Sequence, residues 1–261
     1  MKLSKDFATT SSCYKANRTI TVKGLMLHSV GCNQPDPKVF ARIWKTSTNV
    51  CAHAVLGADG TVIQTLPWNW RGWHGGGSSN NTHIGVEMCE PSTITYKGGA
   101  SFVDNNPAAT KKFVQGTYKT AVELFAYLCN MYKLNPLADG VIVSHNEGYK
   151  RGIASGHADV EHIWSKYGLT MNQFRKDVKA AMNGAAVSQP ETDAEKPAET
   201  GSYKVRVSID DLNIRKGPGT EYPKTGKYTG KGVFTIVETQ GNWGKLKSGA
   251  GWICLDYAKK V

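Results

Sequence analysis

Histidine and acidic side chains gather in one short stretch of the sequence, SHNEGYKRGIASGHADVEHIW at residues 144–164. The stretch holds His145, His157 and His162, three of the chain's seven histidines, together with Asp159. Imidazole nitrogens and carboxylate oxygens are ligands of catalytic zinc, which takes three protein ligands and keeps one position open. The same side chains also occur as plain polar residues ahead of a helix, so this stretch alone predicts neither role.

A second pattern adds one more histidine. The apolar run GLMLHSV at 24–30 predicts a buried strand ending near His28, and GVIVSH at 140–145 predicts a strand ending at His145. Strand ends on one edge of a sheet converge there and hold their side chains rigidly. Two such histidines, followed by His157-Ala158-Asp159, therefore favour a metal site over unrelated core histidines.

The segment WRGWHGGG at 70–77 has the composition of a loop that faces a ligand. Two aromatic side chains, Trp70 and Trp73, flank Arg71, and His74 and three glycines follow. A surface aromatic patch with a flexible tail is the alternative interpretation, and the pattern alone does not separate the two.

The elements that must position these residues indicate an α/β domain. Besides the two strands above, the sequence predicts a helix at 38–45, a hairpin at 52–66 around a Gly-Ala-Asp-Gly turn, a strand at 82–89, and helices at 107–132 and 170–182. In the helix at 107–132 apolar residues recur every three to four positions, and Pro107 suits the first turn. Strands that alternate with helices define the α/β class.

A change in composition divides the chain. NGAAVSQPETDAEKPAETG at 183–201 has no aromatic residue and is rich in Ala, Pro, Glu and Thr, which predicts a flexible linker between domains at 1–182 and 202–261. All the histidines lie in the first domain, so that domain must hold any histidine-based chemistry. In the second, short β-rich runs at 203–207, 233–238, 243–247 and 251–254 alternate with Gly/Pro turns and predict a small all-β barrel.

Composition narrows the function classes. No apolar run is long enough for a transmembrane helix, and the N-terminal lysine has no apolar core behind it, so we expect synthesis in the cytosol without a signal peptide and no membrane insertion. The six cysteines form no CxxC pair and are expected to be buried free thiols. The net charge of +11 suits an anionic partner such as nucleic acid or a cell-wall polymer, but no Lys/Arg-rich block supports nucleic-acid binding.

Four motifs in order carry a family resemblance: HSV after a strand, CAHAVLGADGTVIQTLPWNWRGWHGG, NTHIGVEM, and SHNEG…HADVEHIW. Together they resemble the zinc-dependent N-acetylmuramoyl-L-alanine amidases of the amidase-2 class, which are related to peptidoglycan recognition proteins, over residues 20–167. The resemblance implies a mixed central sheet flanked by helices, a Zn²⁺ cofactor, and hydrolysis of the amide bond between N-acetylmuramic acid and L-alanine of the peptidoglycan stem peptide.

The resemblance assigns the zinc ligands only in part. The family's first two ligand histidines match His28 and His145, but its usual Lys-x-Asp/Cys-Pro signature is replaced here by GHADVEHIW. An alignment of acid to acid makes Asp159 the third ligand and puts His157 where the family often has a catalytic lysine. An alignment on the distance to Trp164 makes His157 the ligand instead. We favour Asp159, and we expect His162 to have a structural role at the following helix.

The family's catalytic carboxylate matches Glu87 in IGVEM, with Glu90 and Glu147 as weaker alternatives. A tyrosine used by some relatives is Ala52 here, which makes this chain of the glutamate type, and the adjacent His53 is expected to support the site by hydrogen bonding. By the same resemblance, the substrate groove is expected to be lined by Trp70, Arg71, Trp73, His74, Asn81 and Thr82.

Residues 212–257 resemble a bacterial SH3 domain through LNIRKGPGT, GNWGKL and GWI. Trp243 and Trp252 are expected to fill its core, and such domains commonly bind cell-wall peptides. Together the two resemblances imply an enzyme like a phage or prophage endolysin, which is made in the cytoplasm and acts on the bacterial wall after release. The alternatives are a non-catalytic peptidoglycan-binding protein and a zinc peptidase that cleaves within the stem peptide.

Overall fold

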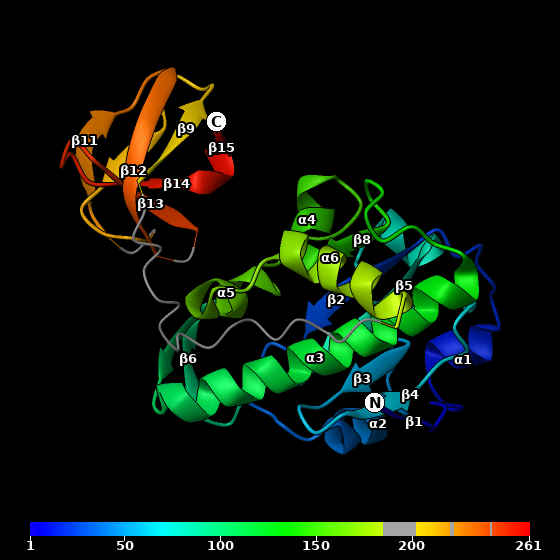
Figure 1. Cartoon of the computed structure of the whole chain (residues 1–261). Coiled ribbons are helices and arrows are strands. Elements are labelled where there is room, and N and C mark those ends of the chain that lie inside the picture. The colour runs from blue at the N-terminus through cyan, green and yellow to red at the C-terminus, as the bar shows by residue number, and fades with distance from the viewer. Residues whose placement is uncertain (185–201, 220–221, 241) are drawn as a thin grey trace. The chain divides into compact units, whose positions relative to one another are not determined.

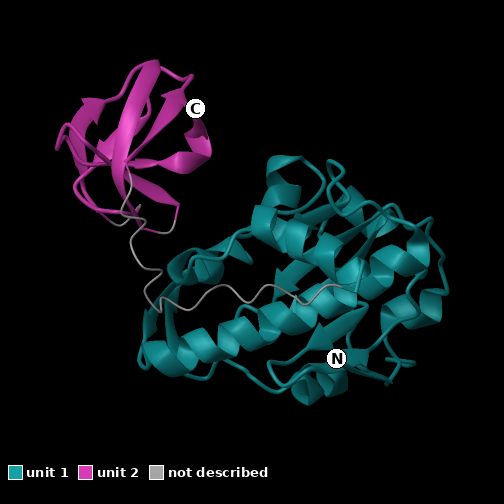
Figure 2. Ribbon diagram, in the orientation of Figure 1, with its two compact units in different colours: residues 1–190 teal, residues 191–261 magenta. Residues whose placement is uncertain are grey.

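The computed structural model describes residues 1–184, 202–219, 222–240 and 242–261 (Figure 1). It divides into two compact units, Met1–Pro190 and Glu191–Val261 (Figure 2). From residue 185 on, the predicted linker lies outside the described residues. Within the described part of the chain, no helix is both long and apolar enough to cross a membrane.

A six-stranded mixed sheet forms the centre of the first unit. Its order is β1-β4-β3-β5-β2-β8, with β1 at Lys2–Lys5, β2 at Gly24–Ser29, β3 at Ala54–Leu56, β4 at Thr61–Gln64, β5 at His83–Met88 and β8 at Ile142–Ser144. The strands pair in parallel except for β3 and β4, which form the antiparallel hairpin expected around the Gly-Ala-Asp-Gly turn. The predicted α/β class with a mixed central sheet is confirmed.

Helices flank this sheet. They are α1 at Ser12–Ala16, α2 at Pro37–Trp44, α3 at Pro107–Tyr132, α4 at His145–Lys150, α5 at Glu161–Trp164 and α6 at Met171–Met182, with 3₁₀ turns η1 at Ser78–Asn81 and η2 at Ser165–Tyr167. The long helix α3 lies across one face of the sheet beside α6 (Figure 1). Asn106 caps the start of α3 by accepting a hydrogen bond from the amide of Ala109. A separate hairpin, β6 at Ile94–Gly98 and β7 at Ser101–Asp104, was not predicted.

Side-chain alternation along the central strands separates the core from the site. Leu25 and Leu27 of β2, like Ile84 and Val86 of β5, join the apolar cluster that includes residues of α3 and α6. His28 follows Leu27 in β2, so its side chain leaves the opposite face of the sheet, where it lines a cavity. Burial of one face therefore fixes which side chains are available for chemistry on the other.

The position of His145 differs from the sequence-based expectation. Strand β8 ends at Ser144, and His145 is the first residue of α4 instead of the last residue of a strand. The cause is a capping box: the Ser144 hydroxyl accepts from the amide of Glu147, and the Glu147 carboxylate accepts from the amide of Ser144. This cap starts the helix at His145 and holds the residue next to the end of the sheet.

The second unit is one seven-stranded antiparallel sheet around a small apolar core. Its order is β11-β10-β14-β13-β12-β9-β15, with β9 at Tyr203–Val207, β10 at Asn213–Arg215, β11 at Lys224–Tyr228, β12 at Gly232–Gln240, β13 at Trp243–Leu246, β14 at Trp252–Cys254 and β15 at Ala258–Lys260, and η3 at Leu255–Tyr257. Trp252 is buried, as expected, whereas Trp243 is only half-buried and lies near the Arg215 guanidinium.

Candidate metal centre

Three side chains from distant parts of the chain meet at the end of β2. The Nδ1 atoms of His28 and His145 are 3.0 Å apart, and they lie 3.4 Å and 3.6 Å from Oδ2 of Asp159. All three residues are buried. Donor atoms arranged tetrahedrally about zinc at ~2.1 Å are about 3.4 Å apart, so this spacing fits a zinc ion with three protein ligands.

Hydrogen bonds behind His28 fix which of its nitrogens faces this cluster. His74 Nε2 donates to the carbonyl of His83 at 3.1 Å, which leaves His74 Nδ1 as an acceptor. His28 Nε2 lies 3.0 Å from that atom and must donate to it. The Nδ1 lone pair of His28 therefore points toward His145 and Asp159, as metal ligation requires.

The second ligand histidine is oriented by a serine. Ser155 Oγ donates to the carbonyl of Gly75 at 3.3 Å, and His145 Nε2 lies 3.2 Å from the same hydroxyl. The hydroxyl can accept from His145 Nε2, so that the Nδ1 lone pair of His145 also faces the cluster. Partners of this kind commonly contribute to metal affinity by holding the ligand ring in place.

The surroundings of His28 and Asp159 favour the protonation states that a metal needs. Burial lowers the pKa of His28 and lowers that of His74 well below the usual value, so both imidazoles are neutral near pH 7. For Asp159 burial opposes ionisation, but contacts with His145 and His28 outweigh it and hold the pKa of the carboxyl far below its usual range. The cluster therefore offers a neutral nitrogen of His28 and the carboxylate of Asp159, with Nδ1 of His145 beside them.

The two candidates for a third ligand occupy different places. Asp159 is in the buried cluster with His28 and His145. His157 is exposed, its ring lies 4.3 Å from that of His145 between centroids, and its Nδ1 is 3.1 Å from Ser155 Oγ. The structure thus brings together His28, His145 and Asp159, the ligand set given by the alignment of acid to acid. His157 lies outside this buried cluster and is exposed.

Glu87 lies directly beside the cluster. It pairs in register with His28 across β5 and β2, and both residues line the same cavity. Within the described residues, its buried Oε2 has no hydrogen-bond partner. Burial raises the pKa of the Glu87 carboxyl well above its usual range, and the negative charges of Asp159 and Glu90 add to the effect. A buried carboxyl with a raised pKa is suited to exchanging a proton.

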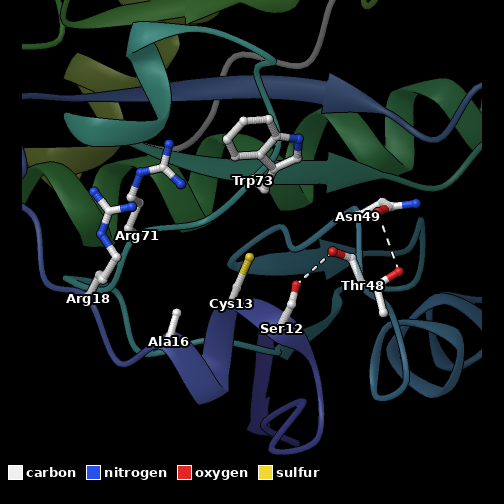
Figure 3. A pocket seen from close by; sticks show the side chains of 8 residues that line it. All are labelled: Ser12, Cys13, Ala16, Arg18, Thr48, Asn49, Arg71 and Trp73. Atoms are coloured by element: carbon white, nitrogen blue, oxygen red, sulfur yellow. Dashed lines mark hydrogen bonds between the residues drawn. The ribbon is translucent and has the colours of Figure 1, made fainter.

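The cluster opens into a cavity of about 1070 Å³. Of the six residues predicted to line the groove, Trp73 and His74 lie on its wall. Arg71 instead lines a second cavity of about 480 Å³, together with Trp73, which belongs to both (Figure 3).

Three of the six residues are engaged elsewhere and are not on the wall of the larger cavity. Trp70 packs on Tyr14, Asn81 accepts a hydrogen bond from Arg71 Nε at 2.7 Å, and Thr82 Oγ1 contacts His83 Nδ1 at 2.9 Å. His74 has a further role, because its ring lies beneath His28 and against Gly85. A Cβ at Gly85 would come within 2.2 Å of the His74 ring.

Part of the cavity wall was missed by sequence reasoning. Tyr96, from the unpredicted β6–β7 hairpin, donates to Glu90 at 2.7 Å and lies 2.7 Å from His162 Nε2. Tyr96 and His162 both line the cavity, so His162 is part of its wall as well as of α5. A polar strand such as TITYKGG carries no sequence signal that would have placed Tyr96 here.

His53 has the supporting role that was expected of it. The amide of Gly85 donates to His53 Nδ1 at 3.0 Å, so His53 Nε2 donates to the carbonyl of Trp70 at 2.7 Å. Burial lowers the pKa of this imidazole to about 4 and keeps it neutral. Both ring nitrogens are used internally, which holds the loop after Trp70 against β5.

Comparison with known proteins places this centre in a family. The family described as N-acetylmuramoyl-L-alanine amidase (Amidase_2) matches residues 17–162. No curated protein gives a significant match. Among solved structures, the Staphylococcus aureus hydrolase AmiA in complex with its ligand is similar, with a TM-score of 0.54 and 17% identity over 72% of this chain and 88% of that chain.

Two further structures share the fold. The E90A mutant of PlyL has a TM-score of 0.52 and 19% identity over 69% of this chain and 99% of that one. The PlyG catalytic domain has a TM-score of 0.52 and 18% identity over 74% and 100%. The family match spans more than half of the chain and contains His28, Glu87, His145 and Asp159. This chain therefore belongs to the N-acetylmuramoyl-L-alanine amidase family.

Proposed function

We propose that this amidase binds Zn²⁺ through His28, His145 and Asp159 and that its substrate bond is the amide between N-acetylmuramic acid and L-alanine in bacterial peptidoglycan. The observation that carries the proposal is the cluster itself, in which two imidazole nitrogens and one carboxylate oxygen face one point at zinc-like spacing. When bound there, zinc would polarise the scissile carbonyl and lower the pKa of a coordinated water toward ~7.

Glu87 is the proposed proton carrier. Its carboxylate accepts a proton from the attacking water and later delivers one to the leaving amine of L-alanine. The position supports this role because Glu87 shares the cavity with the ligands and its Oε2 is not used by another described residue. Strand β5 holds the carboxylate rigidly, so little reorganisation is needed between the two transfers.

His157 is the proposed donor to the oxygen of the scissile carbonyl as negative charge develops there. It stands two residues before Asp159, where the resemblance places a lysine, and it lines the same cavity. A positioned donor of this type is worth roughly 3–4 kcal/mol of transition-state stabilisation. His74 and Ser155 are positioning residues that hold the two ligand rings.

The second unit is proposed to be an SH3-like module that binds the wall. The support is its sequence resemblance, its antiparallel sheet and its exposed aromatic residues Tyr222, Tyr228 and Tyr257. A weak wall binder tethered to the enzyme raises its effective concentration on an insoluble substrate. With the net charge of +11, this organisation supports a lytic role like that of an endolysin.

One experiment tests the catalytic proposal. Bound zinc and release of L-alanine N-termini from purified peptidoglycan are measured for wild type and for Glu87→Gln, His157→Ala and Asp159→Ala. We expect about one zinc per chain in wild type, lost only in Asp159→Ala, and activity impaired in all three variants. Loss of zinc in His157→Ala instead would assign the third ligand to His157. New N-termini other than L-alanine would indicate a peptidase, and wall binding without release would indicate a recognition protein.

A further inference from the structure

The smaller cavity, of about 480 Å³, has two arginines and no acidic residue among the described residues that line it (Figure 3). Arg18 and Arg71 come from separate segments, and the amide of Arg71 donates to the carbonyl of Arg18 at 2.7 Å. The adjacent residues Thr19 and Trp70 form an isolated antiparallel bridge. The backbone therefore places the two arginines side by side at this cavity.

The side chain of Arg71 is held in place by its neighbours. Its Nε donates to Oδ1 of Asn81 at 2.7 Å, and its guanidinium carbon lies 5.0 Å from the centroid of the Trp73 ring. Gly72 stands between Arg71 and Trp73, where a Cβ would come within 2.6 Å of the Cys51 carbonyl oxygen. Gly72 thus faces the interior, and the residues before and after it point the other way and line the cavity.

The positive charge of this pair is not neutralised by the part of the chain that the structure describes. Neither Arg18 nor Arg71 takes part in an ion pair with another described residue. The hydrogen bond from Arg71 to Asn81 uses Nε, so the two terminal nitrogens of the guanidinium remain available as donors. Burial, and then the nearby charge of Arg18, lower the pKa of Arg71. An anion bound between the two guanidinium groups would offset their repulsion.

The smaller cavity adjoins the larger one, which contains the candidate metal centre. Asn49 and the exposed Trp73 line both cavities. A substrate held at the metal centre can therefore extend past Trp73 toward the two arginines. The glycan strand of peptidoglycan has no ionised group once its lactyl carboxyl is in the amide, whereas the stem peptide carries carboxylates. The charge of the smaller cavity therefore favours the peptide part of the substrate.

We propose that Arg18 and Arg71 form a subsite for a carboxylate of the stem peptide, so that the enzyme prefers stems with this carboxylate free over stems in which it is amidated. The inference rests on the proposed function, because it takes the amide of N-acetylmuramic acid as the bond at the metal centre. The N–H donors of a guanidinium match the two oxygens of a carboxylate. The subsite also sets the direction of the substrate, because the peptide must run past Trp73.

The test measures the effect of amidation. Muramoyl tetrapeptides of the sequence L-Ala-D-γ-Glu-L-Lys-D-Ala are prepared with the carboxylate of the second residue and the C-terminal carboxylate each free or amidated. The zinc-loaded full chain gives kcat/KM for peptide release, and calorimetry gives Kd for the corresponding free peptides. We expect amidation at one of the two positions to lower kcat/KM and affinity by roughly 3–10-fold, and by less at high salt. The position that matters identifies the carboxylate.

Variants assign this preference to the two arginines. Arg18→Gln and Arg71→Gln should each reduce the preference to less than about 2-fold. Arg42→Gln is the matched control, because it removes the same charge from α2, outside both cavities, and should keep the preference. Arg71→Lys should keep part of it, since lysine retains the charge but not the paired donors. A preference that persists in both glutamine variants of the subsite, or equal values for all four substrates, would overturn the proposal.

Failure of the proposed function would give a different result. If no muramoyl peptide is cleaved but the free peptides bind with a preference that depends on Arg18 and Arg71, the assigned bond is wrong and the subsite stands. Cleavage of all four substrates at equal rates would support the assigned bond and refute the subsite. Competition by glycerol phosphate, but by no free peptide, would assign the cavity to a phosphodiester polymer of the wall and would also refute it.

Discussion

His28 and Glu87 are register partners on the adjacent parallel strands β2 and β5, so their side chains leave the same face of the sheet at the same level. A candidate metal ligand and the proposed proton carrier are thereby held on neighbouring strands of the central sheet. Neither depends on a loop for its position, whereas His145 and Asp159 are brought to the same point by α4 and the segment before α5. The candidate site therefore combines two residues of the central sheet with two residues of the segments that follow β8.

Glu87→Gln tests the proposed role of Glu87 as proton carrier. The variant keeps the shape of the side chain but cannot accept a proton, so we expect kcat to fall by about 10²–10⁴-fold with zinc content unchanged. Glu147→Gln is the matched control, because Glu147 caps α4 and pairs with Arg175 away from the cavity. Release of L-alanine N-termini from peptidoglycan gives the activity. Loss of zinc from Glu87→Gln would show that the carboxylate is a ligand instead.

The free energy of unfolding of the metal-free protein should vary with pH because the pKa of the buried Glu87 carboxyl is raised in the fold. Because burial raises its pKa in the fold, Glu87 stabilises the fold below its unfolded pKa of about 4.3, and this contribution is lost as pH rises through the folded pKa. Glu87→Gln stays neutral, so with a chelator present it should be more stable than wild type at about pH 8 and equal at about pH 4. Urea denaturation across this range checks it, and a difference that does not vary with pH would argue against a raised pKa.

His74→Phe should weaken zinc binding without removing a ligand. The substitution deletes the acceptor for His28 Nε2 and frees the imidazole to rotate or change tautomer, so we expect affinity to fall by about 10–100-fold. Competition with a chromogenic chelator measures the change, with His83→Gln as control, since the side chain of His83 bonds to the carbonyl of Gly140 instead of to His28. Unchanged affinity in His74→Phe would mean that packing alone orients His28.

His157→Lys should separate two possible roles of residue 157, which are hydrogen-bond donation to the developing oxyanion and metal binding. If His157 supplies a donor to the developing oxyanion, His157→Ala should lower kcat by about 10²–10³-fold with zinc retained. His157→Lys should then recover a large part of that loss, because an ammonium on a flexible stem is also a donor. Failure of lysine to restore activity, with zinc at wild-type level, would point to a role for the imidazole ring against His145 instead.

Removal of residues 202–261 should affect intact walls more than small substrates. The two units have separate apolar cores, so residues 1–184 are expected to fold alone. If the second unit tethers the enzyme to the wall, truncation should lower lysis of intact walls by about 10-fold or more, while cleavage of soluble muropeptides stays unchanged. Turbidity loss and muropeptide chromatography measure the two activities. An equal loss in both would assign the second unit to the catalytic fold.

Strong local signals were sufficient for much of the fold. The helix at Pro107–Tyr132 has the predicted ends, because Pro107 and an uninterrupted apolar period define it locally. The hairpin of β3 and β4 follows from its turn. The β6–β7 hairpin and the wall it contributes were not predictable, because its strands are half polar and its partners Glu90 and His162 are distant in sequence.

The site itself was predictable as a set of residue types, but not as a geometry. Motif order indicated His28, Glu87 and His145, whereas the choice between Asp159 and His157 depended on a loop path that no local pattern encodes. His74 was expected in the groove, and its bond to His28 Nε2 arises only when the loop after Trp70 folds back over β5. Tautomers are decided by such tertiary contacts.

The contact between His74 and Gly85 should make substitutions at these two positions depend on each other during evolution. No side chain larger than hydrogen fits at Gly85 while the ring of His74 lies against it. A lineage that replaced Gly85 would have to move or shrink residue 74 and would lose the acceptor behind His28. The two positions should therefore vary together among descendants of this gene, and a relative with a bulkier residue at 85 should support its first histidine by another route.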